Sequence, residues 1–147
     1  MCRRVGADLA INYKTDDFVA PVKEFTGGRG ADVVIDPVGG DVFDRSTKCI
    51  AFEGRIIVIG FTSGRIPEAK ANHVLVKNYA VVGLHWGLYS QVAPRLIPPV
   101  TEELMKLYAK GAIKPFVSMT KPFVDAKEAL ALVATGGSSG KVVLTLT

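Results

Sequence analysis

The chain has 147 residues, which is enough for a domain with a hydrophobic core. Hydrophobic residues make up 48% of it and charged residues 22%, a composition that excludes a disordered chain. The formal net charge is +4, but lysines and arginines are spread singly, so a nucleic-acid partner is not expected. No apolar run approaches the roughly 18 residues that span a bilayer, and no secretory signal is visible, so we expect a cytoplasmic protein without a membrane partner.

Predicted strands and helices alternate from the start of the chain. Residues 7–13 indicate a short strand, and Thr15 with the acidic residues after it marks a helix start. Pro21 is unfavourable inside that helix and favours a later first turn. The glycines in 27–30 end the helix. Residues 31–36 then form a short apolar run, which predicts a strand buried on both faces.

The second half of this pattern completes a predicted sheet. A helix opens at Gly39 and is stopped by Gly54. Residues 55–60 are the clearest strand in the sequence, and after a short helix at 71–77 a further strand covers 79–84. Such alternation indicates a parallel α/β sheet. Right-handed crossovers then make the three apolar strands neighbours in chain order.

In the last third of the chain the regular alternation of strands and helices ends. A helix capped by Thr101 and stopped by Gly111 is followed by a second helix from Asp125. Glu128 stands where it would complete a capping box with Asp125. A flexible glycine-rich turn and a strand at 141–147 close the chain.

Three loops that directly follow predicted strands carry residues suited to a dinucleotide. They are residues 36–40, 60–64 and 83–87. In a parallel sheet, ligands bind outside the carboxyl ends of the strands, so these loops lie on the binding edge. Each alone is more often a tight turn than a ligand contact. The glycines in 27–30 end a helix and open a strand, the reverse of a phosphate-binding turn, and we interpret them as a turn.

No catalytic or metal-binding constellation is visible in the sequence. His73 and His85 are the only histidines, and neither lies in a nucleophile-elbow motif. Cys2 and Cys49 lack metal-ligand spacing, and Cys49 is predicted to be a small buried hydrophobe. His85 either donates a hydrogen bond to a bound cofactor or substrate, or serves only as a turn residue. Catalytic residues therefore stay unassigned, and no metal is expected.

The order of several motifs resembles that of a known family. The chain is similar over essentially its whole length to the zinc-independent quinone oxidoreductases related to zeta-crystallin, within the medium-chain dehydrogenase/reductase superfamily. One branch of that family is matched in particular at 71–78 and 82–87. The other segments that carry the resemblance are 6–8, 11–13, 34–40, 54–61 and 140–144.

The resemblance implies a partial Rossmann-type parallel sheet in 1–111 and a carboxy-terminal segment, 112–147, of a GroES-like substrate domain. It implies NADPH as cofactor, with NAD as the alternative, no zinc, and hydride transfer to a quinone or enone-like double bond. Tyr13 would lie near the adenosine phosphates and the other contacts beside the nicotinamide and its ribose. The implied cofactor contacts are Tyr13, Val38, Gly60, Phe61, Thr62, Ser63, Leu84, His85 and Trp86.

The family's glycine-rich phosphate turn and most of its substrate domain would lie upstream of Met1. We therefore expect an incomplete family member that binds its cofactor weakly, and the substrate and the preference for NADP or NAD stay open. The alternative is a non-catalytic remnant, at most a weak nucleotide-binding or dimerisation module. A homo-oligomer is expected through strand 79–84, which contains no charge or proline to oppose edge pairing.

Overall fold

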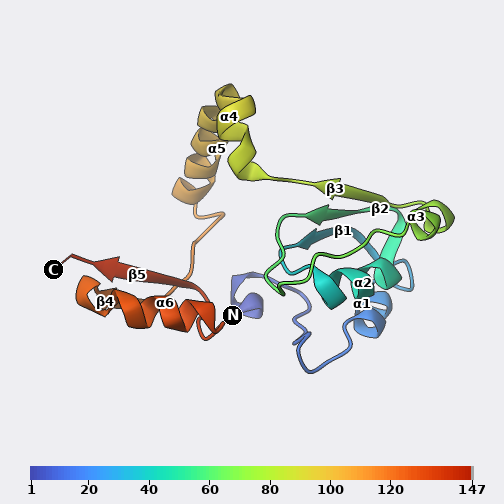
Figure 1. Cartoon of the computed structure of the whole chain (residues 1–147), viewed down its shortest axis with the longest axis horizontal. Helices are drawn as coiled ribbons and strands as arrows, with labels where there is room; N and C mark the ends of the chain where they lie inside the picture. Colours follow the sequence, from blue (N-terminus) through green and yellow to red (C-terminus); the bar gives the residue numbers. More distant parts are fainter. Residues whose placement is uncertain (147) are drawn as a thin grey trace. The chain divides into compact units, whose positions relative to one another are not determined.

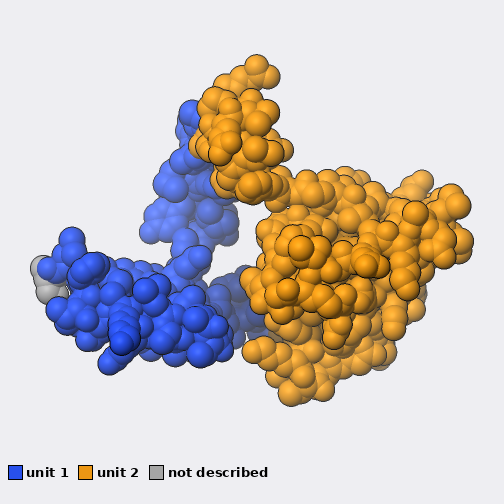
Figure 2. Space-filling view, in the orientation of Figure 1, with its two compact units in different colours: residues 1–7, 98–147 blue, residues 8–97 orange. Residues whose placement is uncertain are grey.

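The computed structural model describes residues 1–146 and divides into two compact units, shown in different colours in Figure 2. One unit is Asp8–Ile97, and the other joins Met1–Ala7 to the carboxy-terminal part from Pro98 onward. Within the described residues, no helix is long and apolar enough to cross a membrane.

A three-stranded parallel sheet forms the larger unit (Figure 1). Its strands are β1 (Ala31–Asp36), β2 (Ile50–Val58) and β3 (Ala80–Gly83), in the order β1-β2-β3. Ile35 is paired with Ile57, and Ile57 in turn with Val82. The predicted parallel sheet and its strand order are thus confirmed.

Helices cover one face of this sheet. α2 (Gly40–Cys49) packs on β1 and β2, and α1 (Val19–Phe25) lies beside α2 in Figure 1. α3 (Ala71–Lys77) contributes Val74 to the core. α2 buries residues at a spacing of three, which places one stripe against the sheet. The core cluster between these layers consists of Phe43, Ile50, Ile56 and Tyr79.

The opposite face of the sheet is open, so the expectation that β1 is buried on both faces is wrong. Val33 and Ile35 of β1 point to that face, and Ile35 is 64% exposed. Val82 on β3 shares this exposed face. Val34 and the residues in register with it, Ile56 and Val81, face the helices and pack in the core with Ile50 and Val58.

The amino-terminal expectations need correction. Residues 7–13 form no strand, because no described strand lies beside them to take up their backbone hydrogen bonds. The first long helix begins at Val19, so Pro21 falls in its first turn, where a missing N–H is tolerated. The carboxylate of Asp17 accepts the Val19 N–H at 3.1 Å.

The helix after β1 also ends earlier than expected. Ile50 already has extended backbone angles, so Cys49 is the last helical residue and β2 begins without a turn. Gly54 therefore does not stop a helix. It lies in a bulge before regular pairing starts at Arg55, where a Cβ would lie 2.9 Å from the Ala51 carbonyl oxygen.

Two further helices follow β3. The helix α4 (Trp86–Val92) was not predicted, and α5 (Ile97–Ala109) begins four residues before Thr101, which is therefore an interior residue rather than a cap. Gly111 ends α5 in a left-handed conformation (φ +71°), as expected.

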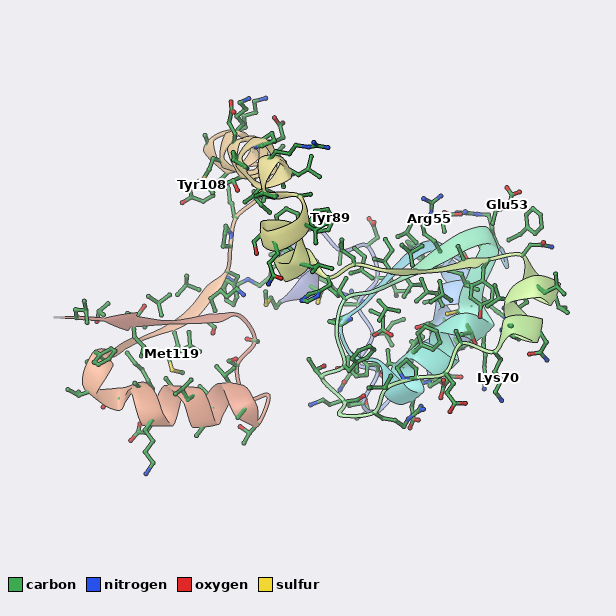
Figure 3. The ribbon with its side chains drawn as sticks, turned by 45° about the horizontal axis from the view of Figure 1, so that its top comes forward. Glu53, Arg55, Lys70, Tyr89, Tyr108 and Met119 are labelled. Atoms are coloured by element: carbon green, nitrogen blue, oxygen red, sulfur yellow. The ribbon has the colours of Figure 1, made fainter. Side chains whose placement is uncertain are left out.

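The carboxy-terminal part is a strand–helix–strand unit. Its elements are β4 (Val117–Pro122), α6 (Ala126–Ala134) and β5 (Lys141–Thr145), and β4 pairs with β5 in parallel. The side chain of Met119, a residue of β4, points toward α6 in Figure 3. Asp125 precedes α6, but no capping side-chain hydrogen bond forms. Glu128 instead accepts a hydrogen bond from Lys121 at 3.0 Å, so the predicted capping box is wrong.

Candidate functional site

The loop after β1 is held in place by Asp36. This side chain is 1% exposed, and its Oδ1 accepts the N–H groups of Val38 at 2.8 Å and Gly39 at 2.9 Å. Gly40 has φ +53°, and a Cβ there would lie 2.7 Å from the Ser63 hydroxyl oxygen. The loop 37–40 therefore requires glycine and packs directly on the next strand-end loop.

The loop after β2 is joined to it through the backbone. The Ile59 N–H donates to the Asp36 carbonyl at 2.9 Å, continuing the sheet beyond β1. The N–H groups of Thr62 and Ser63 donate, each at 3.0 Å, to the carbonyl oxygens of Pro37 and Val38. Two of the three expected strand-end loops thus form one rigid edge.

The loop after β3 leads into α4. Leu84 continues the pairing of β3, since its N–H donates to the Val58 carbonyl at 3.0 Å. His85 precedes the first residue of α4. The ring centroids of Trp86 and Tyr89 lie 5.4 Å apart, so α4 presents an aromatic pair where the chain leaves the sheet.

A pocket of about 790 Å³ lies at the carboxyl ends of β2 and β3. It brings together Gly60 and Phe61 from one loop with Leu84 and His85 from the next. Figure 3 labels Tyr89 on α4, the helix that supplies the remaining wall. All lining residues are Val58, Ile59, Gly60, Phe61, Gly83, Leu84, His85, Leu88, Tyr89, Val92 and Ala93.

The other expected cofactor contacts lie outside this lining. Val38, Thr62 and Ser63 belong to the two hydrogen-bonded loops that support the pocket, and the Trp86 ring contacts that of Tyr89 at a tilt of 31°. Tyr13 lines a separate, polar pocket of about 420 Å³ together with residues of the 14–19 segment, Arg45 and Lys48.

Arg45 organises the Tyr13 pocket. Its guanidinium donates to the carbonyls of Tyr13 at 3.4 Å and Asp16 at 2.8 Å, and to the Asp17 carboxylate at 2.9 Å. The same group lies 4.4 Å from the centroid of the Phe18 ring. The hydrogen bond from Arg45 lowers the pKa of Asp17 below its ordinary value.

Sequence reasoning missed the contribution of α4. Leu88 and Val92 line the pocket one helical turn apart, with Tyr89 between them. The signal was present, because Leu84, Leu88 and Val92 recur every four residues, which is the spacing of one helix face.

The pocket walls contain few groups that can act chemically. Only His85 and Tyr89 contribute polar side chains to the lining, so the walls can orient a ring and donate hydrogen bonds. His73, the other histidine, instead has its Nδ1 3.3 Å from the hydroxyl of Tyr79, whose pKa is raised by burial. Among residues 1–146, no three histidine, cysteine or carboxylate side chains cluster as metal ligands would.

Comparison with known proteins places the chain in a family of oxidoreductases. Residues 5–144 match the family described as zinc-binding dehydrogenase, and the chain belongs to it. The described residues offer no ligand set that fits zinc.

Named relatives bear out the resemblance to quinone oxidoreductases. The chain is 39% identical over 143 residues to a quinone oxidoreductase-like protein 2 homologue of Nematostella vectensis and 34% identical to quinone oxidoreductase-like protein 2 of Bos taurus. These matches cover 97% and 96% of this chain but 39% and 40% of those proteins. The Escherichia coli quinone oxidoreductase complexed with NADPH matches with a TM-score of 0.82 and 29% identity, over 97% of this chain and 44% of that one.

Proposed function

We propose that this chain forms the nicotinamide side of an NADPH site in a reductase that transfers hydride to a quinone or another electron-poor double bond. The observation that carries the proposal is the pocket at the carboxyl ends of β2 and β3, lined by Gly60, Phe61, Leu84 and His85. Ligands of parallel α/β sheets bind at this edge. The E. coli relative complexed with NADPH supports the choice of cofactor.

The chain's residues would hold a flat ring rather than react with it. Bound NADPH supplies the hydride. Phe61 and Leu84 provide apolar surface on which a ring can lie. Gly60 lets the two strand-end loops approach closely, since a Cβ there would lie 3.2 Å from the Pro37 carbonyl oxygen. Apolar walls also exclude water, which strengthens any hydrogen bond that His85 donates.

The pocket beside Tyr13 is proposed to take the adenosine end of the cofactor. Arg45, Lys48 and Lys14 line it together with Asp16 and Asp17, so it combines cationic groups with an aromatic ring. Arginine and lysine are suited to phosphate oxygens. Here Arg45 is already hydrogen-bonded to Asp17, so a phosphate would have to compete with that carboxylate.

Two other assignments belong to the same proposal. The β4–α6–β5 unit is assigned to a substrate domain, with the boundary at residue 112, since its two strands form a separate parallel sheet.

A homo-oligomer is proposed through β3, an edge strand of the three-stranded sheet. That open edge also favours the second candidate function, a dimerisation module without catalysis.

Trp86 is the only tryptophan of the chain and lies against the pocket wall, so it can report cofactor binding. NADPH should quench its fluorescence by energy transfer to the reduced nicotinamide, whereas oxidised NADP should not. Titrations with NADPH and NADH compare the two cofactors directly.

A Gly60→Leu variant should weaken NADPH binding at least tenfold, because a side chain there meets the Pro37 backbone and displaces the two strand-end loops that form this edge of the pocket. Ala20→Leu, which adds the same bulk on the exposed side of α1, is the matched control. Circular dichroism checks that both variants fold. Absence of energy transfer at saturating millimolar NADPH, or equal binding by both variants, would refute the proposed site.

A further inference from the structure

The wall that α4 adds to the pocket is apolar along its length. Leu88 and Tyr89 face the cavity from one turn and Val92 from the next, and Ala93 continues the wall beyond the helix. No lysine, arginine, aspartate or glutamate is among the lining residues. This wall therefore offers no charge to recognise a phosphate or carboxylate, and an ionic substituent would lose its hydration there without compensation.

The cavity is also larger than the reacting rings require. A benzene-sized ring fits a cavity of roughly 150 Å³, so a nicotinamide and a quinone ring together need roughly 300 Å³. The pocket measures about 790 Å³. More than half of it is left after both rings are placed, and α4 borders the pocket beside the strand-end loops.

We propose that the inner face of α4, formed by Leu88, Tyr89 and Val92, selects a substrate whose electron-poor ring or double bond carries an uncharged apolar chain. This inference rests on the proposed function and adds the class of substrate. The ring lies beside Phe61 and Leu84, and the chain extends along α4. A small quinone without a chain leaves this surface in contact with water, so it binds more weakly.

Because the chain would be buried against apolar surface, the proposal predicts how the affinity for a quinone changes with the length of its alkyl chain. A fully buried methylene strengthens binding by about fourfold, and partial burial by less. On the wild-type chain, a series of 1,4-benzoquinones with unbranched alkyl chains of increasing length should therefore bind progressively tighter, by two- to fourfold per methylene. Trp86 again serves as the reporter, because quinones quench tryptophan fluorescence at short range. A parallel titration of free tryptophan amide corrects for the light that the quinones absorb.

Two variants on the same helix separate specific from general hydrophobic binding. Leu88→Asn places an amide in the pocket wall and should flatten the dependence on chain length. Gln91→Asn places the same amide on α4 at a residue outside the lining and should leave the slope unchanged. Circular dichroism of both variants verifies that α4 is retained.

The outcomes distinguish this inference from the proposed function. If the short quinone binds but the slope is absent on the wild-type chain, the α4 surface does not select a chain, while the quinone site stands. An equal slope in Leu88→Asn and wild type likewise overturns the inference. If no quinone of any length quenches Trp86, the pocket is not a quinone site, and the proposed function fails together with the inference.

Discussion

The side chain of Asp36 and the backbone of Gly39 are joined by a 2.9 Å hydrogen bond in which the Gly39 N–H donates to Oδ1. Oδ1 also accepts from Val38, whereas Oδ2 is buried without a partner among the described residues. One oxygen of the carboxylate therefore fixes the strand-end loop, and the other contributes no hydrogen bond.

This division predicts different effects for two substitutions at Asp36. Asp36→Ala should lower the free energy of unfolding by about 2–3 kcal/mol, because two buried N–H groups lose their acceptor. Asp36→Asn keeps an acceptor at the Oδ1 position and should lower it by about 1 kcal/mol or less, since an amide then replaces a buried carboxylate. Urea unfolding measures both values. Equal losses in the two variants would contradict the assigned role of Oδ1.

Gly28 and Gly30 have nearly the same φ values, +87° and +90°, but different surroundings. A Cβ at Gly28 meets nothing within 4 Å, whereas one at Gly30 would lie 2.5 Å from the Cys49 carbonyl oxygen. Gly28→Ala should therefore cost about 1–2 kcal/mol of stability through backbone strain alone. Gly30→Ala should cost a further 1–3 kcal/mol or so from the clash. Thermal and urea unfolding of the pair test this, and indistinguishable variants would argue against the close packing of this turn on the α2–β2 junction.

The two cysteines should differ sharply in reactivity. Cys49 is 2% exposed, and burial raises the pKa of its thiol, whereas Cys2 is exposed. A maleimide reagent or a disulfide reagent at pH 8 should therefore label one thiol rapidly in the folded chain and two in denaturant. Mass spectrometry identifies the sites. Rapid labelling of Cys49 in the folded chain would mean that the α2–β2 core is not formed as described.

The raised pKa of the Cys49 thiol also makes the free energy of unfolding depend on pH. The unfolded thiol loses its proton around its ordinary pKa of 9.0, while burial keeps the folded thiol protonated to higher pH. The unfolded state then binds fewer protons, so stability should fall as pH rises above the unfolded pKa. Cys49→Ala should reduce this decline, and an identical decline in variant and wild type would show that another group is responsible.

Association through β3 can be tested without breaking the sheet. The Leu84 N–H points to β2, and since backbone directions alternate along a strand, the Val82 N–H also points to β2. Proline at Val82 would therefore damage the fold. Val82→Lys instead adds a charge on the exposed face of the edge strand and should shift a dimer toward monomer, with Val76→Lys on the exposed side of α3 as control. A wild-type monomer at micromolar concentration in sedimentation velocity would remove the edge-pairing proposal.

Sequence patterns were sufficient for the sheet but not for its surroundings. The apolar runs at 31–36 and 55–60 identify β1 and the regular part of β2, because few other structures bury such β-branched segments. The same runs gave no information about which face is covered, and the exposed side chain of Ile35 shows that composition alone does not decide burial. The strand expected at 7–13 failed for a related reason, since a strand depends on a partner that local sequence does not specify.

The candidate site was partly predictable for similar reasons. Strand-end glycines identified the loops that contain Gly60 and Leu84, since a parallel sheet brings its carboxyl ends to one edge. The hydrogen bonds from Thr62 and Ser63 to the preceding loop depend on tertiary register and were not predictable. α4 was missed because its seven residues are bracketed by glycine and proline signals that favour a loop.

The central claim is that the nicotinamide half of NADPH binds at the ends of β2 and β3, and amide chemical-shift mapping of the isotopically labelled chain tests it most directly. The predicted result is that nicotinamide mononucleotide shifts the amides of Val38, Gly60 to Ser63 and Leu84 to Trp86, while adenosine 2′,5′-bisphosphate shifts those around Tyr13 and Arg45. Weak binding does not prevent the measurement, since fast exchange still moves the resonances of the residues contacted. Shifts confined to other surfaces, or none at saturating nicotinamide mononucleotide, would contradict the account.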